Sequence, residues 1–426
     1  MNSDNNNNGT PRLRFPGFTG EWEEKKLSDC FTLLRNNNLS RSQLNDITGK
    51  AKNIHYGDVL VNFGDILDVE KEQIPYITDD VTAEQACRES LKNGDVIIAD
   101  TAEDNTVGKC TEIINIGETP VVSGLHTIPL RPSSVFAPGY LGYYMNSQAY
   151  RVGLYPLMQG VKVTSISRNA ILGTNIHFPS SLAEQKKIAE CLMAVDELIT
   201  AQEQKVGALK ERKRGLMQQL FPQLDETTPR LRFPGFIGEW EEKEFGDLIK
   251  ESRLSSKEEN EDVLLTSAID GMFLNSERFS HQRGKSTIGY RKIKRGMLVL
   301  SAQNLHLGNA NVNMRFESGL VSPAYKVYTI IGCLPEFMAQ WVKRDATKEF
   351  FLRATTQGAS ECRKNVVWEQ LYKQTIPVPN NPAEQKIIAD FLSQTDTLIT
   401  AQSQELAVLK AHKQGLMQQL FQQPSK

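Results

Sequence analysis

Two stretches of the chain, residues 183–221 and 383–421, carry a heptad pattern of apolar residues. Both lack proline and are rich in residues that favour helices, and apolar side chains recur in alternating steps of three and four. A helix of about 38 residues is about 57 Å long, so its narrow apolar stripe needs a second helix of that length, which the chain supplies. We expect these residues to pack helix against helix: Ile188, Leu192, Ile199, Leu209, Leu216, Ile388, Leu392, Ile399, Leu409 and Leu416.

The two stretches also repeat outside the seam. The tripeptide at 200–202 returns at 400–402, and residues 215–219 return at 415–419. A heptad helix alone is equally typical of a homodimer, in which two chains cover each other's seams. Because packing fixes only the seam, the wider identity indicates a duplication, or a surface that binds a partner twice.

A second repeat precedes each globular block. The sequence PRLRFPGF at 11–18, followed by GEWEEK at 20–25, recurs as PRLRFPGF at 229–236 and GEWEEK at 238–243. A period near 200 residues is too long for a solenoid unit, so whole domains are duplicated. The predicted organisation is a disordered tail (1–10), a globular block (11–182), a helix (183–221), a linker (222–228), a second block (229–381) and a second helix (382–421).

The two blocks themselves differ in sequence, apart from a few landmarks. Short apolar runs bounded by Gly, Asp and Asn predict strands, and two apolar and aromatic runs predict helices. The expected strands are 58–62, 95–99, 126–130, 177–179, 296–300, 324–328 and 376–379, and the expected helices are 140–150 and 335–344. The predicted fold class is therefore α+β, with two mixed α/β domains and two long helices.

Composition narrows the class of protein. The formal net charge of −2 means that any nucleic-acid site is local rather than spread over the whole surface. The six cysteines form no CxxC pair and have no histidine at ligand spacing, which argues against zinc and against a disulfide framework. The first residues have no apolar core of a signal peptide, and no apolar run is long enough for a membrane span. We expect a soluble, cytoplasmic protein.

The densest basic run lies at residues 282–295 and has six cations without an acid. Clustered cations suit DNA, because each neutralised phosphate releases counterions, although a solvated charged face is the more common meaning of such a run. Its candidate contacts are Arg283, Lys285, Arg291, Lys292, Lys294 and Arg295. The first block has no such run, and its candidates are the dispersed cations Lys109, Lys162 and Arg168.

A Gln-Gly pair occurs shortly before each long helix. Gln159 is followed by Lys162, and Gln357 by Arg363 and Lys364. Glycine allows the backbone to approach a ligand, and glutamine reads adenine through two hydrogen bonds. An ordinary turn with a polar neighbour explains the pattern equally well.

The chain shows no catalytic motif. It lacks GxGxxG, a P-loop, HExxH, GxSxG and the Asn-Pro-Pro-aromatic signature of adenine methyltransferases. The acidic run at 100–104 offers oxygen ligands for a metal, but it occurs once and is more typical of an exposed turn. We predict neither catalytic residues nor a metal site.

From residue 11 onward the chain resembles the specificity subunit of type I restriction–modification systems. The resemblance rests on the repeated PRLRFPGF…GEW and AEQKxIAxxLxxxDxLITAQ…LKxxKxGLMQQLF motifs. It implies that the two blocks are target recognition domains for the halves of an asymmetric double-stranded DNA site. The long helices would pair antiparallel as a coiled-coil spacer.

The resemblance also implies the partners. Two modification subunits would dock on the repeated segments and methylate adenine N6 with S-adenosylmethionine. Motor-nuclease subunits would add restriction with ATP and Mg²⁺, and this chain would bind no cofactor itself. The alternative from another class is a homo-oligomeric coiled-coil scaffold that binds proteins.

Overall fold

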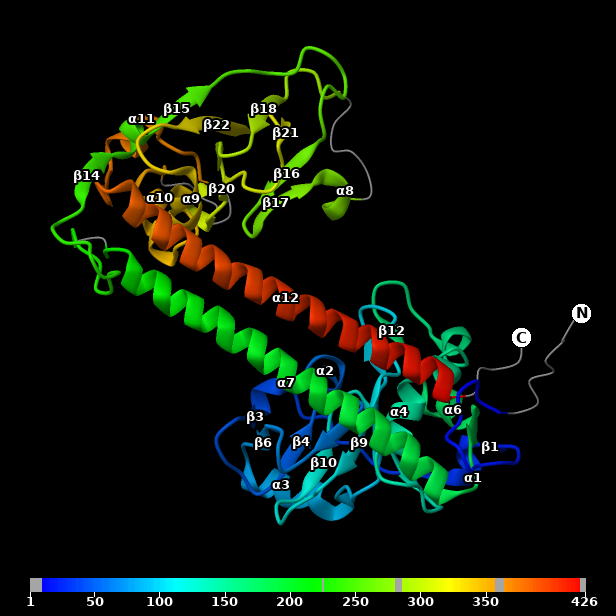
Figure 1. Cartoon of the computed structure of the whole chain (residues 1–426). Helices are drawn as coiled ribbons and strands as arrows, with labels where there is room; N and C mark the ends of the chain where they lie inside the picture. The colour runs from blue at the N-terminus through cyan, green and yellow to red at the C-terminus, as the bar shows by residue number, and fades with distance from the viewer. Residues whose placement is uncertain (1–9, 224–225, 280–285, 357–363, 422–426) are drawn as a thin grey trace, which may run out of the picture. The chain divides into compact units, whose positions relative to one another are not determined.

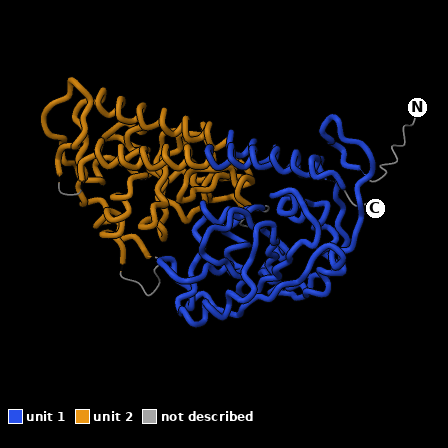
Figure 2. The backbone as a smooth tube through the Cα atoms, turned by 90° about the horizontal axis from the view of Figure 1, so that it is seen from below, with its two compact units in different colours: residues 1–202, 405–426 blue, residues 203–404 orange. Residues whose placement is uncertain are grey.

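The computed structural model describes residues 10–223, 226–279, 286–356 and 364–421, and the fold divides into two units. Unit 1 contains residues 1–202 and 405–426, and unit 2 contains residues 203–404 (Figure 2). Each unit holds one globular head and half of each long helix. We call residues 10–181 the first head and residues 226–381 the second head.

The first head is built on two mixed sheets. Its larger sheet has the strand order β2-β11-β7-β9-β5, in which only the β5–β9 pair is parallel, and its smaller sheet has the order β10-β4-β6-β3. Their bounds are β2 (Phe31–Leu33), β3 (Leu44–Asn45), β4 (Lys52–Ile54), β5 (Ile66–Asp68), β6 (Tyr76–Ile77), β7 (Val96–Ala99), β9 (Cys110–Ile114), β10 (Val121–Ser123) and β11 (Thr127–Pro132).

Short helices and two further strand pairs complete the first head. The pair β1 (Glu23–Lys26) with β13 (Asn175–Phe178) leads into the long helix, and β8 (Thr101–Ala102) pairs with β12 (Thr164–Ser165). The helices are α1 (Leu27–Cys30), α2 (Tyr56–Val61), α3 (Asp80–Ala86), α4 (Tyr140–Asn146), α5 (Gln148–Arg151) and α6 (Arg168–Leu172).

The second head repeats this plan with a smaller sheet system. Its central sheet is antiparallel, in the order β15 (Ile249–Ser252), β22 (Tyr325–Ile330), β19 (Leu298–Ser301), β20 (Ala310–Val312). The other strand pairs are β14 (Glu241–Glu244) with β23 (Thr375–Val378), β16 (Leu265–Ala268) with β17 (Gly271–Leu274), and β18 (Arg291–Lys294) with β21 (Ser318–Val321). The helices are α8 (Asn275–Arg278), α9 (Pro335–Trp341), α10 (Asp345–Arg353) and α11 (Trp368–Lys373).

The two long helices are α7 (Leu182–Leu220) and α12 (Pro382–Leu420), drawn green and red in Figure 1. Within each unit they run antiparallel: Asp196 pairs with Lys413 in unit 1, and Lys213 pairs with Asp396 in unit 2. The apolar stripe lies in this contact, with Ile199 and Val206 buried. The α+β fold with paired long helices is confirmed.

An aromatic residue after each helix inserts into a head. Phe421 packs edge-on to Tyr140 and Tyr144, with ring centroids 5.9 and 5.7 Å away, and Phe221 lies 5.3 Å from Phe337. Such aromatic contacts add stabilisation beyond the apolar area they bury. Each head is therefore fastened to the end of one long helix by its core.

One predicted strand is wrong. Residues 58–62 belong to helix α2 and the residue that ends it, not to a strand. The His55 ring accepts a hydrogen bond from the Gly57 N–H at the start of this helix, and Arg41 pairs with Asp58 at 2.7 Å. A run of three apolar residues does not distinguish a buried strand from a buried helical turn, and these partners lie outside the run.

The other predicted landmarks correspond to observed elements. Residues 95–99, 126–130, 296–300 and 324–328 overlap β7, β11, β19 and β22, and residues 177–179 and 376–379 overlap β13 and β23. The predicted helix 140–150 is two helices, α4 and α5, because the chain bends at Ser147. No helix in the described part of the chain is long and apolar enough to cross a membrane.

Glu112 is a buried carboxylate in the first head and gives its stability a pH dependence. It accepts hydrogen bonds from the N–H groups of Gly139 (2.7 Å) and Gly142 (2.9 Å), at the start of α4. Burial outweighs these bonds and raises the pKa of Glu112 from 4.5 to about 7. The folded state therefore binds this proton more tightly than the unfolded state does.

Stability should consequently fall as the pH rises from about 4.5 to 7, by about 3 kcal/mol for this group at about 1.4 kcal/mol per pKa unit. Glu112→Gln is expected to remove most of that slope, as measured by hydrogen exchange of first-head amides at pH 5 and 7.5. Glu118→Gln, at an exposed position, is the control. If the stability of Glu112→Gln still fell with rising pH, the pH dependence would belong to another titratable group.

Candidate nucleic-acid interface

The repeated segments 11–25 and 229–243, here called the anchor segments, are tied to the long helices by ion pairs. Arg14 donates to both carboxylate oxygens of Glu184, at 2.7 and 2.8 Å, and Arg232 does the same to Glu384 at 2.6 and 2.8 Å. The Trp22 indole also donates to Glu184, as that of Trp240 does to Glu384. The Arg, Trp and Glu of the two repeated motifs thus form one contact in each unit.

A glutamine next to each of these glutamates fixes the chain entering the helix. Gln185 accepts from the Ala137 N–H and donates to the Pro179 carbonyl. Gln385 makes the same two bonds, with Leu334 and Pro379. Ala137 and Leu334 are therefore equivalent positions, and counting from them makes α4 and α5 equivalent to α9 and α10.

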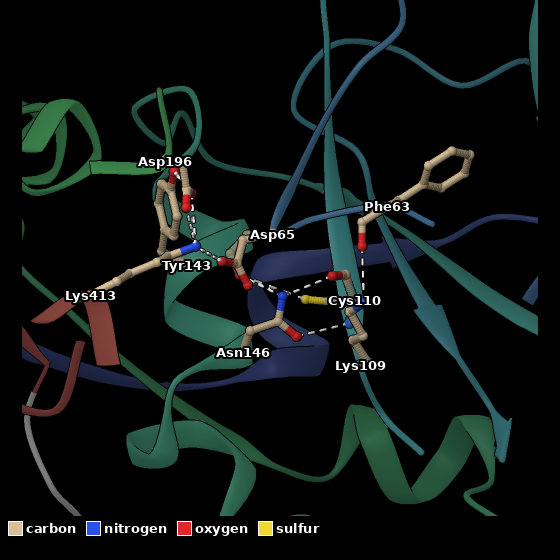
Figure 3. A network of polar contacts seen from close by, with 9 residues as sticks. Phe63, Asp65, Lys109, Cys110, Tyr143, Asn146, Asp196 and Lys413 are labelled. Atoms are coloured by element: carbon tan, nitrogen blue, oxygen red, sulfur yellow. Dashed lines mark hydrogen bonds and ion pairs between the residues drawn. The ribbon is translucent and has the colours of Figure 1, made fainter. Parts of the chain in front are cut away.

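The polar seam residues make a larger network in unit 1 than in unit 2. The Lys413 ammonium lies 2.6 Å from carboxylate oxygens of both Asp65 and Asp196, and the Tyr143 hydroxyl donates to Asp196 at 2.7 Å (Figure 3). In unit 2, Lys213 contacts the single carboxylate of Asp396, at 2.6 and 2.7 Å. Polar groups at seam positions fix the register of paired helices.

The ten predicted helix-packing residues are all buried or half-buried. Ile188, Leu192, Ile199, Ile388 and Leu392 are buried, and Leu209, Leu216, Ile399, Leu409 and Leu416 are half-buried. The residues near the helix starts also belong to the head cores: Ile188 and Leu192 join the first, and Ile388 and Leu392 join the second. Sequence periodicity alone did not indicate this second role.

A hairpin projects from the first head at the predicted Gln-Gly pair. Gln159 and Ser165 exchange backbone hydrogen bonds at 2.9 and 2.8 Å, which closes the loop of residues 160–164. Gly160 has φ +117°, and a Cβ there would lie 2.0 Å from the Val163 carbonyl, so the turn requires glycine. Gln159, Val161, Lys162 and Val163 are exposed, Val161 completely.

Polar residues beside this hairpin were missed by the sequence reasoning. Strand β12 pairs with β8, and the Ile166 N–H donates to the Asp100 carbonyl, which brings Asp100, Thr101 and His126 next to the hairpin. His126 Nδ1 lies 3.2 Å from the Asp100 carboxylate. The predicted Arg168 is exposed and donates to the Asn36 side chain. These residues are far apart in the sequence, and the pairing of β8 with β12 brings them close to the hairpin.

Lys109 has a different environment from the other first-head candidates. Its ammonium donates to the carbonyls of Leu60 (3.0 Å) and Phe63 (2.9 Å), and Figure 3 shows it pointing toward the Phe63 carbonyl. Burial is the main cause that lowers its pKa. A phosphate contact by Lys109 would require it to leave both carbonyls.

In the second head, part of the basic run lies on β18. Lys292 pairs with Glu261 and Arg295 with Glu317, while Arg291 donates to the Arg253 carbonyl. Lys294 is exposed and makes no ion pair with a described residue. Two cations of the run are therefore neutralised by carboxylates that lie outside it in the sequence. Arg283 and Lys285 lie outside the described residues.

The second head has paired backbone segments at the place equivalent to the hairpin of the first head. Thr356 N–H donates to the Asn365 carbonyl at 2.9 Å, and Val366 N–H donates to Ala302, as Ile166 does to Asp100. Lys364 is half-buried, and its N–H donates to the Gln303 carbonyl. Gln357 and Arg363 lie outside the described residues.

In the described ranges, no group of three or more His, Cys, Asp or Glu side chains is arranged to hold a metal. The acidic residue Asp104 of the run at 100–104 instead accepts hydrogen bonds from the N–H (2.8 Å) and hydroxyl of Thr106, as in an ordinary turn. The five described cysteines, Cys30, Cys87, Cys110, Cys191 and Cys333, are free thiols.

Part of the chain matches a known family of domains, and part matches a curated relative. Residues 237–411 match the family described as "Type I restriction modification DNA specificity domain". A putative specificity subunit of the type I restriction enzyme MjaX, from Methanocaldococcus jannaschii, is 24% identical over 205 residues, which are 47% of this chain and 45% of that protein. The chain thus spans about half the length of this curated relative.

Two solved structures share the fold along almost the whole chain. The type I restriction–modification S subunit from M. genitalium has a TM-score of 0.54 at 12% identity, covering 98% of this chain and 100% of that one. A chain from a study of complex assembly and conformational transition of the type I R-M system has a TM-score of 0.54 at 15% identity, covering 97% and 99%. Residues 237–411 thus match the type I specificity domain, and the chain as a whole shares its fold with these two structures.

Proposed function

We propose that this chain directs a type I restriction–modification complex to an asymmetric, two-part DNA sequence. The observation that carries the proposal is an equivalent backbone pairing in two unlike heads: the Ile166 N–H donates to the Asp100 carbonyl, and the Val366 N–H donates to the Ala302 carbonyl. Equivalent placement suits two half-sites read in the same manner. Because the heads differ in sequence, the half-sites should differ, whereas a symmetric dimer would favour a palindrome.

In the first head the hairpin and its neighbours supply the chemistry of base reading. Gln159 suits adenine, Val161 and Val163 offer apolar contact to a thymine methyl group, and Lys162 suits a phosphate. The exposed Arg168 and His126 add donors beside them. In the second head we assign Lys294, Lys364, Gln357 and Arg363 to the same task.

We further propose that the paired helices set the number of unread base pairs between the half-sites. Each has 39 residues and is therefore about 58 Å long. One turn of B-DNA is about 34 Å, so helices of this length suit half-sites in successive major grooves on one face of the duplex. The Lys413 and Lys213 contacts support this role, because they hold the helices in one register.

The outer faces of the long helices support docking of two modification subunits. Leu198 and its repeat Leu398 are 57% and 46% exposed, next to the exposed pairs Thr200–Ala201 and Thr400–Ala401. The described residues leave this repeated apolar pair largely uncovered. The docked subunits would methylate adenine N6 with S-adenosylmethionine, and motor-nuclease subunits using ATP and Mg²⁺ would add cleavage.

The decisive experiment maps N6-methyladenine in DNA from cells that carry the modification partner, with and without this gene. The expected result is gene-dependent methylation of one asymmetric, two-part motif with a fixed gap. Unchanged methylation, with both proteins present and folded, would favour the homo-oligomeric scaffold. The structure already weighs against that alternative, since within each unit the seam of one helix is covered by the other helix of the same chain.

The salt dependence of DNA binding tests the assigned cations. Lys294→Gln and Lys162→Gln should each remove about one phosphate contact, which makes the slope of log Kobs against log[salt] less negative by about 0.9. The measurement is fluorescence anisotropy of a duplex containing the motif, with the modification partner present. Lys50→Gln is the control, because Lys50 already pairs with Glu84. Unchanged affinity and slope would remove the tested lysine from the interface.

A further inference from the structure

A basic pocket of about 480 Å³ lies in unit 2, between the last turns of α7 and the junction of α9 and α10. The volume is in the range of small-molecule sites. Among the described residues Asp345 is the single acidic one that lines it, and it pairs with Lys348 at 3.0 Å. The cations that line the pocket are Lys210, Lys213, Arg214, Lys343 and Arg344.

The buried guanidinium of Arg344 is the main reason to expect an anion in this pocket. Its side chain is buried, its guanidinium donates to the Pro222 carbonyl at 2.6 Å, and it lies 4.9 Å from the centre of the Phe221 ring. Among the described residues it has no carboxylate partner, and burial alone lowers its pKa to about 10. A buried guanidinium remains charged at neutral pH and is costly without a counter-charge.

The neighbouring cations are also incompletely neutralised. Lys343 donates to the Ile269 carbonyl at 2.8 Å, and its pKa is lowered to about 8, chiefly by burial. Lys213 also lines the pocket and pairs with one carboxylate, that of Asp396. Its counterpart Lys413 pairs with two carboxylates. Arg214 is exposed and pairs with Glu211 on its own helix. Cations therefore exceed carboxylates around the pocket.

The equivalent place in unit 1 shows that the duplicated fold does not require these cations. Counting from Ala137 and Leu334, the residues equivalent to Lys343 and Arg344 are Asn146 and Ser147, and Gln414 replaces Arg214. Asn146 is bonded to the backbone of Cys110, and Ser147 to the Tyr144 carbonyl. The second half thus carries cations at three positions where the first half has neutral residues.

We propose that this pocket binds a phosphate group, held by Arg344 and Lys343 on one side and by Arg214 on the other. Arginine suits the purpose because its planar donors match phosphate oxygens, and lysine adds a point charge. Two sources carry such a group: the polyphosphate of a free nucleotide and the backbone of nucleic acid. The inference does not depend on the proposed DNA specificity, since a small phosphate ligand suffices.

The test is calorimetric titration of the full chain with inorganic pyrophosphate and, separately, with duplex DNA at low salt. Three variants place the chain's own unit 1 residues in the pocket: Arg214→Gln, Lys343→Asn and Arg344→Ser. We expect each to weaken phosphate binding at least tenfold. Arg214 is exposed, so its variant keeps the test valid even if Arg344→Ser unfolds by releasing Pro222. Lys386→Gln is the control, because Lys386 pairs with Asp390 on α12 and neither residue lines the pocket.

The two titrations separate the sources. Weaker pyrophosphate binding by the variants assigns the pocket to a free phosphate ligand, and weaker DNA binding with no pyrophosphate binding assigns it to the nucleic-acid backbone. No binding of either, or binding that the three variants leave unchanged, overturns the proposal. If both titrations failed, the proposed function would be unaffected, because the methylation map tests it separately.

Discussion

Lys413→Met is expected to lower the stability of unit 1 by about 3 kcal/mol, the cost of breaking a buried ion pair from one side. The Lys413 side chain is only 17% exposed, and it separates the carboxylates of Asp65 and Asp196. Methionine preserves the packing along the seam but leaves two negative charges facing each other. The measurement is the free energy of opening of first-head and α12 amides by native-state hydrogen exchange, which resolves each unit separately.

The matched control is Lys213→Met at the equivalent position of unit 2. It leaves a single carboxylate, Asp396, which is 47% exposed and remains hydrated, so the expected loss is about 1 kcal/mol. Asp65→Asn should recover part of the loss in Lys413→Met by removing one of the two facing charges. Equal losses for the two lysine variants would mean that packing at this position, and not the arrangement of carboxylates, sets the cost.

This difference between the two lysines could not be read from the sequence, although much of the architecture could. The heptad period identified both long helices and their inner faces, because side chains three and four apart share a helix face. The duplicated motifs identified two equivalent halves. Lys213 and Lys413 occupy equivalent positions of the repeated helices, but Asp65, which distinguishes them, is 348 residues from Lys413 in the chain.

The candidate interface was predictable only where the signal was local. The Gln-Gly pair marked the hairpin at residues 159–165, since glycine is required at its turn. The basic run of the second head looked uniform, because Glu261 and Glu317, which pair with Lys292 and Arg295, lie outside it. His126 and Asp100 gave no signal, since their proximity arises from strand pairing. The contacts predicted at Arg283, Lys285, Gln357 and Arg363 remain predictions.

The ion pair between the anchor segment and α7 should have the second large effect on stability. Glu184 is 2% exposed in its side chain and accepts both arms of Arg14 together with the Trp22 indole. Glu184→Gln removes the charge and leaves the guanidinium largely buried with an amide that matches only one of its donors. We expect a loss of about 3 kcal/mol and faster exchange of amides in residues 11–25.

Two further variants decide whether the charge pair is the cause. Glu190→Gln breaks an exposed pair with Lys186 on the same helix and should cost less than about 0.5 kcal/mol. The double variant Arg14→Met with Glu184→Met replaces both charges by apolar groups and should be more stable than Glu184→Gln alone, because no unpaired charge stays buried. If the double variant were no more stable than Glu184→Gln, the unpaired charge would not be the cause of the loss. The hydrogen-bond geometry of the repeated Arg, Trp and Glu would then be what stabilises the contact. The near-identity of the anchor segments would then reflect the shape of the junction between head and helix.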